Sequence, residues 1–142
     1  MQGCLFCDLL AKGNINGLIM ENRHAVALAS DSFREGHCVI DLKKHKKSVS
    51  ELDMDEYTSI CELITKVSRA LEKKYDCDKT YLLSIGDKVE HIHFHLIPKH
   101  KDKCSMGVYC FDRLQEIEGV RKPSDSELNA LATEIRKIID SS

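Results

Sequence analysis

Apolar residues recur at helical spacing in three segments of the chain. The clearest helix is predicted from about Asp53 to Lys74, with Asp53 and Glu56 at capping-box spacing. Its expected core stripe consists of Tyr57, Ile60, Ile64, Val67 and Leu71. A second helix is predicted to begin near Ser124 and Glu127 and to carry Leu128, Leu131, Ile135 and Ile138. A short helix over Cys4 to Lys12 is expected to stop at Gly13.

Other short segments are predicted to be strands, and one of them alternates Cys38, Ile40 and Leu42 with His37, Val39 and Asp41. These segments are Ile19 to Glu21, Ala25 to Ala29, His37 to Lys43, Tyr81 to Ile85 and His91 to Ile97. Pro98 is expected to end the pairing of the last strand or to lie at an edge. Short strands in neighbouring pairs, with helices grouped between them, predict one α+β domain over residues 1–142 with a mainly antiparallel sheet.

Composition narrows the class of protein. The 142 residues carry a formal net charge of −2, which argues against a nucleic-acid partner. The sequence has neither an apolar run of membrane-spanning length nor the basic and apolar pattern of a signal peptide. Seven cysteines, including Cys38 and Cys61 inside apolar patterns, favour reduced thiols and a cytoplasmic location over a disulfide framework.

Three histidines alternate within the last predicted strand. In a strand, His91, His93 and His95 share one face, and the intervening Ile92 and Phe94 point to the other. An exposed strand that carries histidines without a function would explain one such residue better than three. The row therefore indicates a functional site.

Two chemistries suit this row, and spacing does not decide between them. Neutral imidazole is a nucleophile near pH 7, and its neighbours can bind phosphate oxygens and move protons. Alternatively, His91, His93 and His95 could hold a catalytic metal. The absence of Asp or Glu within the run counts against a metallohydrolase, which needs a base.

The sequence resembles the histidine-triad family. His91-Ile92-His93-Phe94-His95-Leu96-Ile97 matches the signature His-φ-His-φ-His-φ-φ, where φ is apolar, at every position. Cys4-Leu5-Phe6-Cys7 resembles the family's opening, and Gly36 to His45 resembles its Gly-His…Pro-Lys-x-His segment, with Leu42 in place of the proline. The resemblance covers residues 1 to about 100.

The resemblance implies a five-stranded antiparallel sheet with flanking helices, a homodimer, and a small-molecule nucleotide as substrate. Such proteins hydrolyse or transfer nucleoside monophosphates from dinucleoside polyphosphates, phosphoramidates or nucleotide sugars. It implies that His93 is the nucleophile, that His95 and His37 support it, and that His91 lies at the edge of the same site. The sequence resembles a bacterial-type subset of diadenosine polyphosphate hydrolases in particular.

The chain departs from the family pattern around the substrate. Ser84 stands where Asn or Gln is common, and only residues 85–90 separate it from the triad. Ser84, Lys88 and His91 are the expected substrate-binding residues. In the shortened loop, Lys88 is expected to supply a charge for the phosphates. Ala29 stands where the family often has an acidic residue, and Asp31 is the nearest substitute.

Cys4 and Cys7 lie three residues apart, so one helical turn would place their sulfurs on the same side. The family resemblance supplies His45 and His91 as two further ligands of a structural zinc. The alternative is that both thiols only pack beneath the first helix. A redox function of the pair is disfavoured because no βαβ context surrounds it.

Two other features have simpler explanations. Lys43, Lys44, Lys46 and Lys47 are expected to be solvated charges, and His24 and His100 are expected at the surface. Besides the nucleotidyl-transfer enzyme and the metallohydrolase, a third hypothesis remains. It is a zinc-stabilised nucleotide-binding interaction protein with weak or no catalysis.

Overall fold

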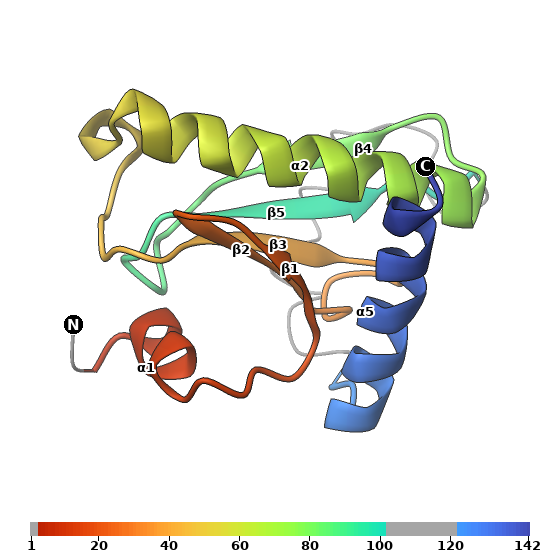
Figure 1. The fold of residues 1–142 in the computed structure, drawn as a ribbon, viewed down its shortest axis with the longest axis horizontal. Coiled ribbons are helices and arrows are strands. Elements are labelled where there is room, and N and C mark those ends of the chain that lie inside the picture. The colour runs from red at the N-terminus through yellow and green to blue at the C-terminus, as the bar shows by residue number, and fades with distance from the viewer. Residues whose placement is uncertain (1–2, 102–121) are drawn as a thin grey trace.

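A computed structural model describes residues 3–101 and 122–142, and it has a five-stranded sheet in the order β1-β2-β3-β5-β4 (Figure 1). Every neighbouring pair of strands is antiparallel. The strands are β1 (Leu18–Glu21), β2 (Ala25–Ala29), β3 (Cys38–Leu42), β4 (Thr80–Leu83) and β5 (His93–Pro98). The helices are α1 (Leu5–Ala11), α2 (Met54–Tyr75) and α5 (Asp125–Asp140), with a 3-10 turn at Val49–Glu51. The α+β prediction with an antiparallel sheet is confirmed.

One face of the sheet is apolar and forms the core. Cys38, Ile40 and Leu42 of β3 point to it, as do Phe94 and Leu96 of β5. Because side chains alternate along a strand, His37, Val39 and Asp41 point to the other face, together with His93 and His95. The sheet thus separates a hydrophobic layer from a layer that carries the histidines.

Helix α2 covers the apolar face. The capping box of Asp53 and Glu56 is present, as predicted. The predicted core stripe was wrong at its first position, because Tyr57 is 43% exposed. The buried stripe begins one residue earlier, at Glu56, and continues through Ile60, Leu63 and Val67 at intervals of four, three and four residues. Tyr57 is therefore rotated by about 100° away from the sheet.

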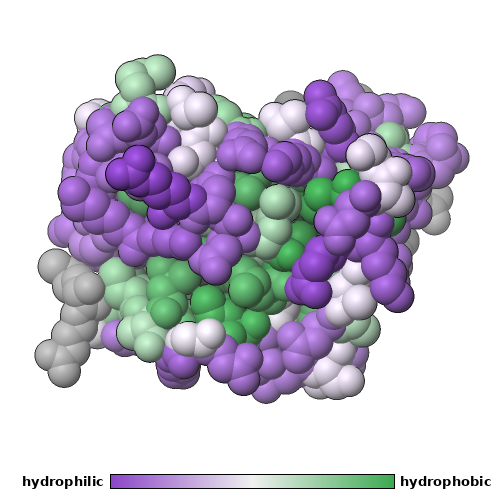
Figure 2. Space-filling view, viewed as in Figure 1, coloured by the Kyte–Doolittle hydropathy of each residue, from purple (hydrophilic) through white to green (hydrophobic). Residues whose placement is uncertain are grey.

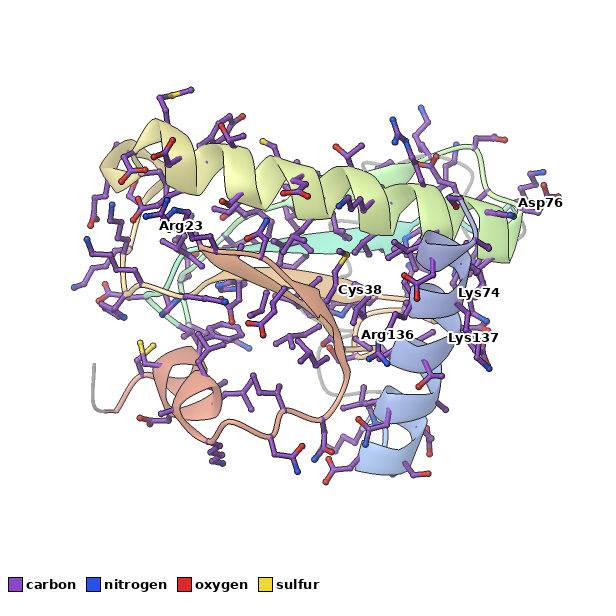
Figure 3. All side chains as sticks on the ribbon, viewed as in Figure 1. Arg23, Cys38, Lys74, Asp76, Arg136 and Lys137 are labelled. Atoms are coloured by element: carbon purple, nitrogen blue, oxygen red, sulfur yellow. The ribbon has the colours of Figure 1, made fainter. Side chains whose placement is uncertain are left out.

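Helix α5 packs beside α2 and against β1 (Figure 1). The Ser124 side chain accepts a hydrogen bond from the Glu127 backbone N–H, which caps the helix at the predicted position. Arg136 extends from α5 toward β1 and donates to the Ile19 carbonyl at 2.9 Å (Figure 3). Lys74 of α2 forms an ion pair with Glu134 of α5. The last helix therefore closes the core beside the first strand.

Helix α1 lies on the opposite side of the sheet from α2 (Figure 1), and none of its residues is buried. Figure 2 shows hydrophobic surface between α1 and α5 in this view, bordered by hydrophilic residues. Among the described residues, no helix combines the length and the apolar character that a membrane span requires.

Two predicted strand boundaries differ from the structure by two residues, and several others differ by one. β5 begins at His93 rather than His91, because the N–H groups of His91 and Ile92 bond to Val89 and Lys46 outside the ladder. β4 ends at Leu83, and Ile85 is exposed. Pro98 is the last residue of β5, opposite Thr80, in agreement with its predicted place.

Candidate active site and metal centre

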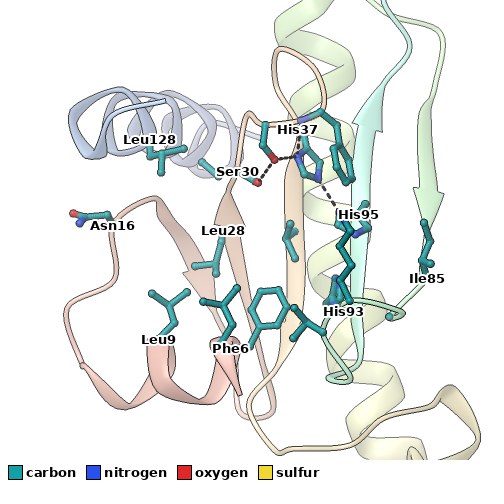
Figure 4. Close-up of a pocket in the computed structure, with 18 of the residues that line it drawn as sticks. Phe6, Leu9, Asn16, Leu28, Ser30, His37, Ile85, His93, His95 and Leu128 are labelled. Atoms are coloured by element: carbon teal, nitrogen blue, oxygen red, sulfur yellow. Dashed lines mark hydrogen bonds between the residues drawn. The ribbon is translucent and has the colours of Figure 1, made fainter. Parts of the chain in front are cut away.

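A cavity of about 690 Å³ opens on the histidine face of the sheet (Figure 4). Its walls come from α1, from β2 and the loop after it, from the segment 85–89, and from the start of α5. Apolar side chains form much of the lining, including Phe6, Leu9, Leu28, Val39 and Leu128. The polar groups of His37, His93 and His95 face the same space. Apolar walls with a few converging polar groups are typical of a small-molecule site.

His93 has one ring nitrogen fixed by the backbone. Nδ1 lies 2.6 Å from the His91 carbonyl oxygen. Because a carbonyl only accepts, Nδ1 carries the proton and Nε2 carries the lone pair. Burial lowers the pKa of His93 below its usual value, with the hydrogen bond to His91 opposing that shift. His93 is thus a neutral imidazole at pH 7, with its lone pair on Nε2.

His37 and His95 are joined in a hydrogen-bond chain with two serines (Figure 4). The Phe33 backbone N–H donates to His37 Nδ1 at 3.4 Å, so that nitrogen holds a lone pair. His37 Nε2 therefore carries the proton and donates to His95 Nδ1 at 2.9 Å. By the same reasoning the proton of His95 is on Nε2. The site thus offers one lone-pair nitrogen on His93 and one N–H donor on His95.

The chain of hydrogen bonds that begins at His95 and His37 ends in the loop after β2. Ser32 Oγ is 3.2 Å from His37 Nδ1, and Ser30 Oγ is 2.9 Å from Ser32 Oγ. Phe33 stacks on the His37 ring with centroids 4.5 Å apart. Burial lowers the pKa of His37 well below its usual value, followed in effect by the charges of His95 and His93. His37 therefore relays hydrogen bonding as a neutral ring.

His100 supports this loop from behind, and its prediction as a surface residue was wrong. It is 8% exposed, and its Nε2 donates to the Glu35 carbonyl at 2.7 Å. Its ring packs edge-on against Tyr75, which also lies against Gly36. Gly36 has φ +85°, and a Cβ there would meet the Tyr75 ring at 2.4 Å. Only glycine fits immediately before His37.

The structure brings some predicted substrate-binding residues to the cavity and not others. Lys88 lines it. Ser84 lies outside the lining and donates its hydroxyl to the His93 carbonyl at 2.8 Å. His91 is fully buried, also outside the lining. Asp31, with φ +51°, accepts the Gly36 N–H at 2.7 Å, so its carboxylate shapes the turn.

Cys4, Cys7, His45 and His91 converge beside the cavity, with one ligand atom from each within 4.8 Å of the others. The sulfurs of Cys4 and Cys7 both lie 3.4 Å from His91 Nδ1, and Cys7 Sγ lies 3.5 Å from His45 Nδ1. Around a tetrahedral zinc with ordinary bond lengths, neighbouring sulfur and nitrogen ligands are about 3.5 Å apart. These residues fit zinc in number, type and spacing.

His91 is oriented for this cluster by its second nitrogen. Nε2 lies 2.7 Å from the Leu42 carbonyl and must carry the proton. Nδ1 is then a lone pair that faces both sulfurs, as a metal ligand requires. Both ring nitrogens of His91 are engaged, Nε2 by the Leu42 carbonyl and Nδ1 by the two sulfurs, so His91 does not join His93 and His95 around a single metal ion. The metallohydrolase hypothesis with a metal held by these three residues is contradicted.

The basic run at 43–47 differs from its prediction at one position. The Lys46 side chain is 14% exposed and pairs with the buried Glu56 at 2.5 Å. Lys43 and Lys47 form exposed pairs with Glu21 and Glu90. Lys46 therefore holds the segment that carries His45 against the start of α2. The exposed ion pairs of Lys43 and Lys47 contribute little to the stability of the fold.

Asp41 was missed as a site residue. It is 0% exposed, and burial raises the pKa of its carboxyl to about 9, with the nearby Cys4 thiol adding to the effect. Its alternation with His37 and Val39 already placed it on the histidine face. Other contributors, Phe6, Ser30, Ser32 and Asp125, had no comparable signal, because their place at the cavity depends on how α1, a loop and α5 pack.

Comparison with known proteins decides the family. A family model described as the HIT domain matches residues 14–102. The chain belongs to the HIT family. The match ends before α5, although Asp125 and Leu128 of that helix line the cavity. Nucleotide hydrolase or transferase activity of the HIT family is accordingly plausible for the chain.

Individual relatives show the range of the family. An adenosine 5′-monophosphoramidase of Schizosaccharomyces pombe is 28% identical and aligns with 75% of this chain and 82% of its own. A zinc-bound histidine triad protein from Mycobacterium smegmatis has a TM-score of 0.72 at 18% identity, covering 98% of this chain and 94% of that one. A diadenosine triphosphate hydrolase of Plasmodium falciparum has a TM-score of 0.71 at 16% identity, covering 91% and 80%. The two solved structures confirm the HIT-like fold.

Proposed function

We propose that the protein hydrolyses or transfers a nucleotidyl group through a covalent intermediate on His93. The observation that carries this proposal is the pair of opposite tautomers at the cavity, a lone pair on His93 Nε2 and a proton on His95 Nε2. A lone pair attacks phosphorus, and an N–H beside it stabilises the negative charge that develops on phosphate oxygens.

The reaction runs in two displacements. His93 Nε2 attacks the α-phosphorus, the P–N bond forms, and the bond from phosphorus to the leaving group breaks. The leaving group takes a proton in the process, and the His37–His95 chain holds the donor. Water then attacks phosphorus, the P–N bond breaks, and the nucleoside monophosphate leaves. Breaking the P–N bond returns the lone pair to His93 Nε2, and the proton lost by water replaces the one that the His37–His95 chain gave to the leaving group.

A P–O bond to a polyphosphate and a P–N bond of a phosphoramidate are both candidates for cleavage. The names of the S. pombe and P. falciparum relatives support one each. The lining supplies apolar walls for a base and neutral Asn14, Asn16 and Ser30 for a sugar. Lys88 lies on the loop beside the histidines and is proposed to meet the phosphates. Ser84 instead donates to the His93 carbonyl, and the His91 carbonyl accepts from the His93 ring.

The zinc proposed at Cys4, Cys7, His45 and His91 has a structural function. Four protein ligands close the coordination shell, as in structural sites, so His93 carries the chemistry. The site bridges α1 to the segment before β5, and α1 has no buried residue of its own. α1 brings Phe6 to 4.7 Å from the His93 ring. Metal binding is therefore proposed to hold one wall of the cavity.

A substrate panel tests the enzyme against the binding-protein alternative. Zinc-loaded protein is incubated with diadenosine tri- and tetraphosphate and with adenosine 5′-phosphoramidate, and nucleoside monophosphate release is measured. Turnover of at least one substrate, lost in His93→Ala, is expected. Binding of AMP without turnover of any substrate would instead favour a nucleotide-binding interaction protein with weak or no catalysis.

A homodimer is proposed on family grounds, and exposed apolar side chains offer a place for it. Met54 and Tyr57 on α2 are 73% and 43% exposed, and Leu82 on the edge strand β4 is 51% exposed. An isologous interface would cover such a patch on both copies. Light scattering at micromolar concentration is expected to give twice the chain mass, and a monomer mass would contradict the proposal.

A further inference from the structure

Asp41 is a buried carboxyl group without a hydrogen-bond donor. It lies near the end of β3, is 0% exposed, and neither Oδ1 nor Oδ2 has a hydrogen-bond partner in the described part of the chain. Desolvating such a group without compensation destabilises the fold. An apolar side chain would stabilise this strand better, so folding alone does not explain an aspartate here.

The neighbours of Asp41 belong to both sites. Its Cα partner on β5 is His93, and its partner on β2 is Val26. Its Oδ1 lies 3.8 Å from His91 Nε2, on the side of that ring away from the cysteine sulfurs. The same Nε2–H donates to the Leu42 carbonyl at 2.7 Å. Asp41 therefore lies near Nε2 of the proposed zinc ligand His91. It is also the cross-strand partner of the proposed nucleophile His93.

We propose that Asp41 is a positioning residue for the zinc site, acting on Nε2 of His91, the ring nitrogen that does not face the sulfurs. A histidine that binds a metal nearly always donates its second ring N–H to a carboxylate or a carbonyl, which fixes the tautomer and raises the basicity of the ligand. Here Leu42 accepts that N–H, and the Asp41 carboxyl group lies 3.8 Å from the same nitrogen, too far for a hydrogen bond but close enough to act on it electrostatically. The inference rests on the zinc site proposed above.

The effect of Asp41 on stability should then reverse when metal binds. In the metal-free protein the carboxyl is an uncompensated buried polar group. In the zinc-loaded protein it lies close to a divalent cation and to a more polarised His91 N–H, so it contributes favourably. The His91 carbonyl also fixes His93 Nδ1–H. Asp41 is thus linked through one residue to the orientation of the nucleophile.

The experiment compares Asp41→Val and Asp41→Asn with the wild-type chain. Zinc affinity is measured by competition with a chromophoric chelator, and thermal unfolding is followed in the metal-free and zinc-loaded forms. Asp41→Val should lower zinc affinity about 10- to 100-fold, the range typical of outer-shell partners. It should also raise the Tm of the metal-free protein. Asp41→Asn keeps the shape and one acceptor, so it should lose less affinity and leave the metal-free Tm nearly unchanged.

Val26→Ala is the matched control, since Val26 is the cross-strand neighbour of Asp41 and is 2% exposed. It should lower the Tm of both forms and leave zinc affinity unchanged. Unchanged affinity in both Asp41 variants would overturn the inference, as would a lower metal-free Tm in Asp41→Val, which indicates a carboxyl satisfied by buried water. Wild-type protein that binds no zinc would refute the zinc site itself and this inference with it.

Discussion

His91 and His93 are two residues apart, yet we propose different functions for them. In His93 the backbone holds Nδ1, and Nε2 is left for chemistry. In His91 the backbone holds Nε2, and Nδ1 is left for the sulfurs of Cys4 and Cys7. A carbonyl oxygen can only accept, so the choice of ring nitrogen is made by the fold. The proposed roles of nucleophile and metal ligand thus follow from which ring nitrogen of each histidine a carbonyl holds.

The largest expected effect follows from removing the nucleophilic half of this pair. His93→Ala should lower kcat by about 10⁴-fold or more, because the covalent route is lost. AMP binding, measured by calorimetry, should remain, since His37, His95 and the apolar walls are intact. His95→Ala should cost less, as it removes a donor. Equal losses of kcat in the two variants would contradict a separate role of His93 as the nucleophile.

The proposed zinc site, to which His91 belongs, is tested by the variant Cys4→Ser. Loss of one zinc ligand should lower the Tm by about 10 °C, which corresponds to roughly 3 kcal/mol in a domain of this size. AMP affinity should fall as well, because α1 carries Phe6 into the cavity wall. Cys61→Ser, on α2 and outside the cluster, is the control and should leave zinc content unchanged. Metal analysis that finds no zinc in wild-type protein purified without chelators would refute the site.

Much of this comparison was visible in the sequence. Alternation alone placed His91, His93 and His95 on one face, and the capping box marked the start of α2. The different ring orientations could not be predicted, because they depend on carbonyls whose positions follow from where β5 begins. His100 and Lys46 were misplaced for a similar reason. Their partners, the Glu35 carbonyl and the buried Glu56, are distant in sequence or on another element.

A smaller effect on kcat is expected from changing the serines that hydrogen-bond to His37. Ser32→Ala removes a hydrogen bond to His37 Nδ1 that is worth about 1 kcal/mol, so kcat should fall several-fold to tenfold with KM nearly unchanged. Ser32→Thr should restore most of the rate. Ser30→Ala breaks only the outer link and should cost less. A change confined to KM would show that the serines bind substrate instead.

The smallest effect concerns pH. Burial lowers the pKa of His93 and of His37, so the neutral site persists below the usual histidine pKa of about 6.5. The acid limb of kcat/KM should therefore lie below pH 6.5. The unfolding free energy should also decline as pH falls below 6.5, because the unfolded chain takes up protons first. Each such group changes stability by at most about 1.4 kcal/mol per pH unit. A rate that halves near pH 7.5 would contradict these directions.

The central claim is that His93 Nε2 bonds to phosphorus, and trapping the adduct tests it most directly. Protein is mixed with a substrate labelled in the nucleotidyl group and quenched in base, since a phosphorus–nitrogen bond to histidine is labile in acid and stable in base. Peptide mapping and phosphorus NMR then locate the label. The account predicts one labelled peptide with the nucleotidyl group on Nε2 of His93. Label on Ser84, on Nδ1 of His93, or surviving an acid quench would contradict it.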